Sequence, residues 1–268
     1  MPFLPLGDEN KRLRIDLPAV TWGLMGTCFL VFIYQEGISL AAWQEFVYGF
    51  GFIPAVLGGA AGLAPDLERL PGAVTLVTYQ FLHGSWDHLL GNLLFLWIFG
   101  DNVEDAMGHL RFLAFYLLCG VLAGVAHYLA EPDSLVPLIG ASGAISGVLG
   151  AYLLLHPFSR ITVLLVILPL RLPAWILLLV WFGFQFVSLG EGGTEEIAWL
   201  AHIGGFLVGA ALIPFFKLRE VRLFARQDTV KSLRLPGGRR RRKASAPSAG
   251  QRRAVDPDQR PRRRGPWG

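Results

Sequence analysis

Six apolar segments constrain this chain more than any other feature of its sequence. They cover approximately residues 18–35, 88–107, 111–129, 142–155, 173–189 and 197–216. A helix needs about 20 apolar residues to cross the roughly 30 Å hydrocarbon core of a bilayer. Only 16% of the residues are charged, whereas soluble domains carry about 25%. We therefore predict an all-α integral membrane protein with six transmembrane helices.

The charges of the loops predict the orientation of these helices. With six spans, the loops 36–87, 130–141 and 190–196 share one side and contain ten acidic residues and one basic residue, Arg69. The other 23 Lys and Arg residues lie on the opposite side or in the tail. Because basic loops stay in the cytoplasm, we expect a multi-pass protein of the plasma (inner) membrane with both termini cytoplasmic.

Composition divides the chain into three parts. Residues 1–17 form a cytoplasmic N-terminal segment, residues 18–216 form the membrane domain, and residues 217–268 form a tail. The tail holds 17 of the 24 basic residues and has too little apolar surface to fold alone. We expect it to be disordered and to contact anionic lipid head groups. Nucleic-acid binding is the weaker alternative, and we do not expect it.

The stretch 161–168 fits the six-span pattern poorly. It is apolar and β-branched, and Pro169, Arg171 and Pro173 follow at once. Because it is too short to span a bilayer, we predict an interfacial segment before the fifth helix. If it were a seventh span, the direction of the sixth helix through the membrane would invert, and Ser142, Asn92 and His202 would not lie at one depth.

Three polar residues are expected at one depth of the membrane. The fourth segment begins at Ser142, within Gly140-Ala141-Ser142-Gly143, and has 14 residues. At about 1.5 Å per residue it spans roughly 21 Å, so its start should lie about 9 Å below the outer surface. His202 lies five residues into the sixth segment, and Asn92 lies one turn into the second. Polar groups inside a membrane are costly and mark function.

Glycine pairs predict how the serine and the histidine meet. Gly143-x-x-x-Gly147 and Gly205-x-x-x-Gly209 have the spacing that permits close contact between helices. Packing these two faces together would bring the serine against the histidine. Helix packing without catalysis is the alternative, and either pair taken alone favours it. The shared depth of the polar residues shifts the balance toward a site.

Four short motifs occur in order on alternate segments. They are His83-x-x-x-x-His88-x-x-x-Asn92, Phe99-Gly100 with Val103-Glu104 and Gly108, Gly140-Ala141-Ser142-Gly143, and Ala201-His202-Ile203-Gly204-Gly205. Over roughly residues 73–216 the chain thereby resembles the rhomboid family of intramembrane serine proteases. The resemblance implies a bundle of six transmembrane helices with a short central fourth helix. It also implies a serine endopeptidase that cleaves single-pass transmembrane proteins within or near their membrane segment.

The resemblance also implies a role for each matching residue. Ser142 matches the nucleophile and His202 its general base, in a dyad without an acidic third member. Asn92 and His88 match side chains that face the oxyanion, together with the backbone N–H of Ser142. His83 matches a histidine that organises the first external loop.

Other positions of the family pattern bear on how the site is supported. Gly143 and Gly205 match positions of close helix packing, and Gly140 belongs to the frame of the nucleophile. A tyrosine often lies beneath the catalytic histidine, one turn after the nucleophile. Here that position is Ser146, which we expect as a candidate hydrogen-bond partner of the His202 ring.

The expected partners are single-pass transmembrane substrates and the lipid bilayer, while the oligomeric state is not predicted. We expect no cofactor, and no metal because no cluster has convincing metal-ligand spacing. Trp181 and Phe184 of the fifth segment could line a lateral path for substrate, although we expect lipid-facing packing. Two other functions stay open. A catalytically inactive rhomboid-like client-binding protein would usually lack the serine or the histidine, and a transporter would want charged groups or paired repeats.

Overall fold

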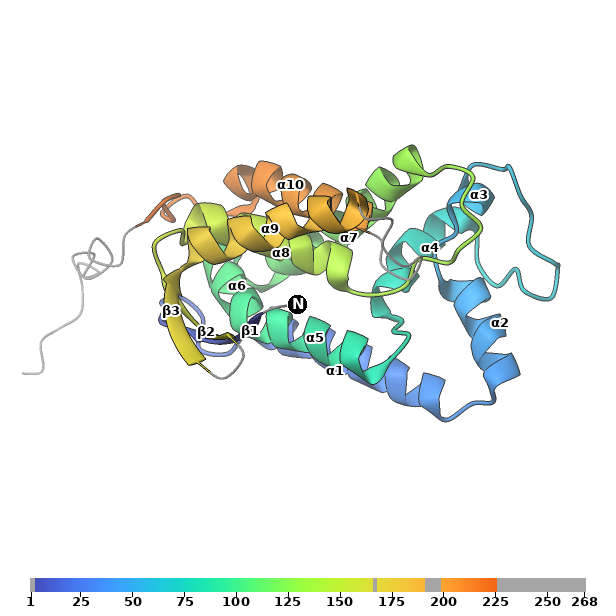
Figure 1. Ribbon diagram of the computed structural model, residues 1–268, viewed down its shortest axis with the longest axis horizontal. Coiled ribbons are helices and arrows are strands. Elements are labelled where there is room, and N and C mark those ends of the chain that lie inside the picture. Colours follow the sequence, from blue (N-terminus) through green and yellow to red (C-terminus); the bar gives the residue numbers. More distant parts are fainter. Residues whose placement is uncertain (1–2, 166–167, 191–198, 226–268) are drawn as a thin grey trace, which may run out of the picture. The chain divides into compact units, whose positions relative to one another are not determined.

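The computed structural model describes residues 3–165, 168–190 and 199–225 and is mostly helical (Figure 1). In chain order the elements are β1 (Phe3–Asp8), α1 (Ala19–Glu36), α2 (Leu40–Phe50), α3 (Pro54–Leu57), α4 (Gly72–Thr78), η1 (Tyr79–Phe81), α5 (Trp86–Phe95), η2 (Leu96–Gly100), α6 (Asp101–Met107), α7 (His109–Ala130), α8 (Ser142–Leu155), β2 (Arg160–Leu165), β3 (Leu168–Pro173), α9 (Ala174–Gly190) and α10 (Trp199–Phe216).

Helices occupy the stretches that the sequence predicts to be apolar spans. One helix covers each stretch except the second, where α5, the π-helical turn η2 and α6 follow one another without a break. Residues 197–198 of the sixth stretch lie outside the described residues. Among the described helices, α7 and α10 are long and apolar enough to cross a membrane, whereas α8 and α9 are shorter apolar helices.

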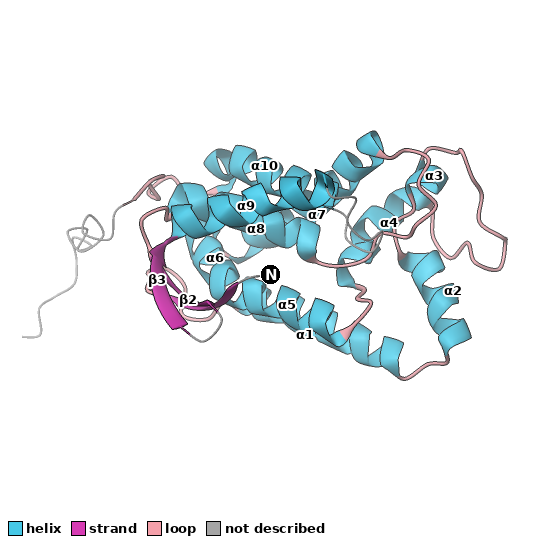
Figure 2. Ribbon diagram, in the orientation of Figure 1, coloured by secondary structure: helices cyan, strands magenta, loops and turns pink. Residues whose placement is uncertain are grey.

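A three-stranded antiparallel sheet in the order β1-β2-β3 corrects the all-α prediction (Figure 2). β1 pairs with β2 from Phe3↔Leu165 to Asp8↔Ile161, and β2 pairs with β3 from Arg160↔Pro173 to Leu165↔Leu168. Part of the stretch 161–168, predicted as an interfacial segment, is thus strand β2. Its β-branched residues favour a strand, but its partner β1 lies about 155 residues away in the sequence, beyond the reach of any local pattern.

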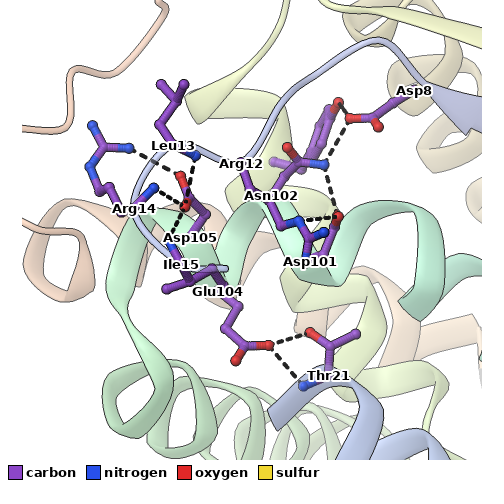
Figure 3. A network of polar contacts seen from close by, with 11 residues as sticks. Asp8, Arg12, Leu13, Arg14, Ile15, Thr21, Asp101, Asn102, Glu104 and Asp105 are labelled. Atoms are coloured by element: carbon purple, nitrogen blue, oxygen red, sulfur yellow. Dashed lines mark hydrogen bonds and ion pairs between the residues drawn. The ribbon is translucent and has the colours of Figure 1, made fainter. Parts of the chain in front are cut away.

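The two ends of the described chain pack against the helices. Asp105 of α6 accepts hydrogen bonds from the backbone N–H groups of Leu13, Arg14 and Ile15 at 3.0, 2.6 and 2.9 Å (Figure 3). Beyond α10, the N–H of Leu218 donates to Ala106 at 2.9 Å. The predicted tail from residue 217 onward therefore begins with a stretch that packs on the domain, and residues 226–268 lie outside the described residues.

The central helix of the core is α8, and it positions the site. Of its 14 residues, 11 are buried, as expected for a helix that is apolar on all sides, and it contacts α7, α10 and η2. A methyl group on Gly205 would overlap the carbonyl oxygen of Gly143, and one on Gly209 would overlap that of Gly147. This backbone contact brings the first turn of α8 next to the first turn of α10.

Candidate active site

Ser142 is the first residue of α8 and follows a sharp turn at Gly140. Gly140 has a φ angle of +122°, which L-residues rarely adopt. A Cβ atom at Gly140 would also lie 2.6 Å from Nε2 of His88. Both the backbone angle and the crowding therefore require glycine here. The first four N–H groups of a helix have no intrahelical acceptor, and that of Ser142 is one of them.

Ser142 and His202 are joined by a hydrogen bond. Oγ of Ser142 lies 2.7 Å from Nε2 of His202, although the two residues are 60 positions apart in the sequence. His202 is 9% exposed. A serine hydroxyl is a weak nucleophile unless a base within this distance takes its proton. The pair therefore has the geometry of a nucleophile and its base.

The second ring nitrogen of His202 contacts a residue that the sequence analysis missed. Nδ1 of His202 lies 3.0 Å from Oε1 of Gln185 in α9, and Gln185 is fully buried. Ser146, predicted as a candidate partner of the ring, instead donates its hydroxyl to the carbonyl of Ser142 at 2.7 Å. The sequence signal for this contact was a single amide side chain within the largely apolar fifth segment.

Two tryptophans flank the ring of His202. The centroid of the Trp181 ring lies 6.3 Å from that of His202 at an interplanar angle of 33°, and the Trp199 ring lies 5.9 Å away at 90°. Trp181 is 5% exposed, so the expected lipid-facing packing of Trp181 is wrong. Phe184, in contrast, is 40% exposed and contacts Trp199 edge to face. One ring of α9 and one ring of α10 therefore flank the histidine.

Asn92 and His88 come from α5, which contacts α8. Ser85 caps this helix by accepting a hydrogen bond from the N–H of His88 at 3.2 Å. Asn92 is 8% exposed, and its Nδ2 has no hydrogen-bond partner within the described part of the chain. A buried amide donor without a partner is costly, and Nδ2 of Asn92 is therefore free to donate to an acceptor that enters the site.

His83 lies in the loop before α5 and is fully buried. Gln35 of α1 holds its backbone on both sides, because the N–H of His83 donates to Oε1 of Gln35 at 3.1 Å and the His83 carbonyl accepts from Nε2 at 3.1 Å. The rings of His83 and His88 meet edge to face at 5.1 Å. Burial, with a contribution from His88, lowers the pKa of His83 to about 3, so this ring is neutral near pH 7.

Three predicted glycines lie at close contacts around the serine. A Cβ atom at Gly143 would lie 2.9 Å from Cβ of Ala123 in α7. Gly140 touches His88, and Gly205 touches the backbone of α8, as described above. Among the described residues, no group of three or more His, Cys, Asp or Glu is placed to hold a metal ion. The site is thus built from side chains of α5, α8, α9 and α10.

Comparison with known protein families gives one domain match. Residues 71–219 match the family model described as "Rhomboid domain". "Putative rhomboid protease YdcA" of Bacillus subtilis is 38% identical over 154 residues, which is 57% of this chain and 70% of the relative. "Rhomboid protease GluP" of the same organism is 37% identical over 137 residues, which is 51% of this chain and 25% of the relative.

A plant relative matches a similar share of the chain. "Rhomboid-like protein 11, chloroplastic" of Arabidopsis thaliana is 33% identical over 153 residues, which is 54% of this chain and 53% of the relative. The match thus spans about half the length of the plant protein and a quarter of GluP.

Proposed function

The chain belongs to the rhomboid family, and on that premise we propose that it is an intramembrane serine endopeptidase. Its substrates are single-pass transmembrane proteins, cleaved within or near their membrane segment. The observation that carries this proposal is the 2.7 Å hydrogen bond between Oγ of Ser142 and Nε2 of His202. An inactive client-binding relative has no need of a paired nucleophile and base.

In this proposal the six apolar helices cross the plasma (inner) membrane with both termini in the cytoplasm. The acidic loops then face outward, and the basic segments and tail face the anionic inner leaflet. The 14 residues of α8 extend over roughly 21 Å, so Ser142 lies below the outer surface. Water reaches Ser142 from the outer side of the membrane. The partly apolar surroundings strengthen every hydrogen bond at the site.

The first half of the reaction forms an acyl-enzyme. Oγ of Ser142 attacks the carbonyl carbon of the scissile peptide bond while its proton passes to Nε2 of His202. The carbonyl oxygen becomes an oxyanion that accepts hydrogen bonds from the N–H of Ser142, Nδ2 of Asn92 and the ring of His88. Each preorganised donor of this kind contributes about 2.7–4 kcal/mol. The C–N bond then breaks, and His202 returns the proton to the leaving amine.

The second half consumes one water molecule. Nε2 of His202 takes a proton from water, and the resulting hydroxide attacks the acyl carbon. The tetrahedral intermediate collapses, the bond from the carbonyl carbon to Oγ breaks, and Oγ takes the proton back from His202. The products are a new carboxyl terminus and the free serine. The reaction uses no cofactor.

Substrate enters sideways from the bilayer along α9 in this proposal. The exposed ring of Phe184 lies against Trp199 at the start of α10, so the two rings form the outer part of that path. A transmembrane helix must unwind locally before its peptide bond can reach Ser142, because a helical backbone keeps its carbonyl groups hydrogen bonded. Helix-breaking residues near the cleavage site therefore favour cleavage.

The test compares cleavage of a single-pass transmembrane substrate in detergent by the parent protein and by Ser142→Ala and His202→Ala. Ser134→Ala is a matched control, because Ser134 lies in the loop before α8 and, within the described residues, its hydroxyl only accepts a 3.4 Å hydrogen bond from the N–H of Val136. We expect cleavage by the parent and the control alone. Unchanged cleavage by both site variants would refute the dyad. A parent that binds the substrate but never cleaves it would favour the client-binding function.

A further inference from the structure

Gln185 of α9 contributes an amide side chain to an apolar helix. Among residues 174–187, Gln185 is the only residue with a side-chain amide or an ionisable group, and it is fully buried. A buried amide costs free energy unless both of its ends are hydrogen bonded. Both ends of this amide have partners: Nε2 donates to the carbonyl of Trp181 at 3.0 Å, and Oε1 faces Nδ1 of His202 at 3.0 Å.

The carbonyl of Trp181 determines which end of the amide faces the histidine. If the amide were turned over, Oε1 would face the Trp181 carbonyl oxygen, and two acceptors would oppose each other. The amide therefore presents Oε1 to His202. An oxygen of this kind accepts only, so Nδ1 of His202 must carry the proton. The neutral ring then leaves the lone pair on Nε2, which faces Oγ of Ser142 at 2.7 Å.

We propose that Gln185 is the positioning residue of the dyad: it selects the His202 tautomer that can take the serine proton, and it fixes the plane of the ring. This inference rests on the proposed function, in which Ser142 and His202 are the reacting pair. An amide orients the ring as the carboxylate of a serine-protease triad does, without the desolvation cost of a buried charge. Gln185 thus supports the ring of His202, a role for which the sequence had suggested Ser146.

A consequence concerns the helix that carries this residue. The hydrogen bonds run from the backbone of α9 through Gln185 and His202 to Ser142 on α8. The orientation of the base therefore depends on α9 being packed against α10, which it contacts. A displacement of α9 that breaks the hydrogen bond between Gln185 and His202 would leave the ring of His202 free to rotate.

The first experiment measures serine reactivity directly. A fluorophosphonate probe phosphonylates Oγ of Ser142 with loss of fluoride, and His202 takes the hydroxyl proton. We compare the parent with Gln185→Leu, which removes the acceptor at similar size, and with Val187→Ala, an exposed position of α9. Labelling by Gln185→Leu should fall roughly 10- to 100-fold, which is at or below the lower end of the roughly 10²–10⁴-fold that a general base supplies, because the base is misplaced and not removed. Val187→Ala should label like the parent.

A double-mutant cycle separates positioning from general destabilisation. Because Gln185 acts only through His202 in this proposal, Gln185→Leu should cause no further loss of labelling in the His202→Ala background. With a peptide substrate, Gln185→Leu should lower kcat and leave KM unchanged. Equal losses of labelling in both backgrounds would assign Gln185 a purely structural role and overturn the proposal.

The second experiment does not depend on activity. Imidazole ¹⁵N chemical shifts, with the His202 signals assigned by their loss in His202→Ala, report which ring nitrogen carries the proton. The parent should show a protonated Nδ1 and an unprotonated Nε2, and Gln185→Leu should show both tautomers. If the parent neither labels nor cleaves, the proposed function fails and these shifts alone decide the inference.

Gln185→Glu keeps the test decisive if Gln185→Leu fails to fold. A carboxylate accepts the same Nδ1–H and favours the doubly protonated ring, so the acid limb of the pH–rate profile should move to higher pH. The ¹⁵N shifts should report double protonation at a correspondingly higher pH. Two results would overturn the proposal. One is a Gln185→Glu protein with the same pH–rate profile and ¹⁵N shifts as the parent, and the other is a Gln185→Leu protein with the same His202 tautomer as the parent.

Discussion

The carboxylate of Glu104 in α6 holds the first turn of α1 through Thr21. One oxygen accepts the Thr21 N–H at 2.8 Å and the Thr21 hydroxyl at 2.6 Å (Figure 3). The other accepts the N–H of Val20 at 3.0 Å. Glu104 is fully buried. The residue before α1 is Pro18, which provides no side-chain cap. A side chain from a different helix therefore satisfies two of the free N–H donors of this helix start.

Glu104→Gln should therefore destabilise the protein. The variant replaces one acceptor oxygen with an NH₂ group that opposes an N–H donor of α1, and hydrogen bonds to charged groups contribute about 1.5–3 kcal/mol each. We expect a loss of about 2–3 kcal/mol, measured as a lower thermal midpoint in detergent. Glu68→Gln, at an exposed carboxylate, is the control and should melt like the parent. Equal midpoints for all three proteins would contradict the capping role.

Gly209→Ala tests the backbone contact between α8 and α10. The added methyl overlaps the carbonyl oxygen of Gly147, and overpacking of this kind costs about 1–3 kcal/mol. The helices must separate, so the rate of fluorophosphonate labelling at Ser142 should fall together with the thermal midpoint. Gly26→Ala in α1 meets nothing within 4 Å and should be neutral or gain up to about 1 kcal/mol. A Gly209→Ala protein with parental stability and labelling would show that the contact is loose.

Gly140→Ala tests the turn before the nucleophile. At a φ angle of +122° an alanine is strained by about 1–3 kcal/mol, and its Cβ displaces the ring of His88. We expect the rate of substrate cleavage to fall roughly 10²-fold, as when an oxyanion donor is lost. Gly84→Ala, whose Cβ would meet Ile139 at an ordinary 3.5 Å, should keep activity. Similar losses of activity in both variants would point to a general disturbance of the loops.

The stability of the protein should fall in mild acid because of His156, which follows the last residue of α8. Burial lowers the pKa of His156 to about 4, although Asp105 raises it and Arg14 lowers it further. The unfolded chain, with an ordinary pKa near 6.5, binds the proton first. Stability is therefore complete above about pH 6.5 and decreases as the pH falls toward about 4.

The measurement compares thermal midpoints of the parent and His156→Gln between pH 8 and pH 4. The variant lacks this titration, so the parent should lose on the order of 2 kcal/mol relative to the variant between about pH 6.5 and pH 4. Above pH 7 the difference between the two midpoints should be constant. Midpoint curves that run parallel over the whole range would exclude a contribution from His156.

The sequence allowed the helices and the pairing of Ser142 with His202 to be predicted for local reasons. Fourteen residues from Ser142 predict a helix too short for a bilayer, and the structure has α8 over Ser142–Leu155. The family resemblance is confirmed by the domain match over residues 71–219. The glycine spacing of α8 and α10 predicted a close contact, since small residues at intervals of four lie on one face.

The predictions that failed concern partners distant in the sequence. Ile161 to Leu165 pairs with residues of β1, and no local periodicity indicates that the first residues of the chain supply a strand. Ser146 lies one turn after Ser142, where a residue that supports His202 was expected. Its hydroxyl instead donates to the carbonyl of Ser142 in its own helix. Short polar side chains within a helix commonly bond the carbonyl four residues earlier.

The sequence by itself determined the apolar segments, the family and the chemistry-bearing residue types, because hydrophobic periods and short motifs are local properties of the chain. Only the tertiary structure decided which side chain holds the ring of His202. Each residue turns a helix by about 100°. The rotation of α9 about its axis and its position along that axis therefore decide whether Gln185 faces the ring of His202 or the outside of the protein. That rotation follows from the packing of α9 against α8 and α10, which no segment of the sequence specifies alone.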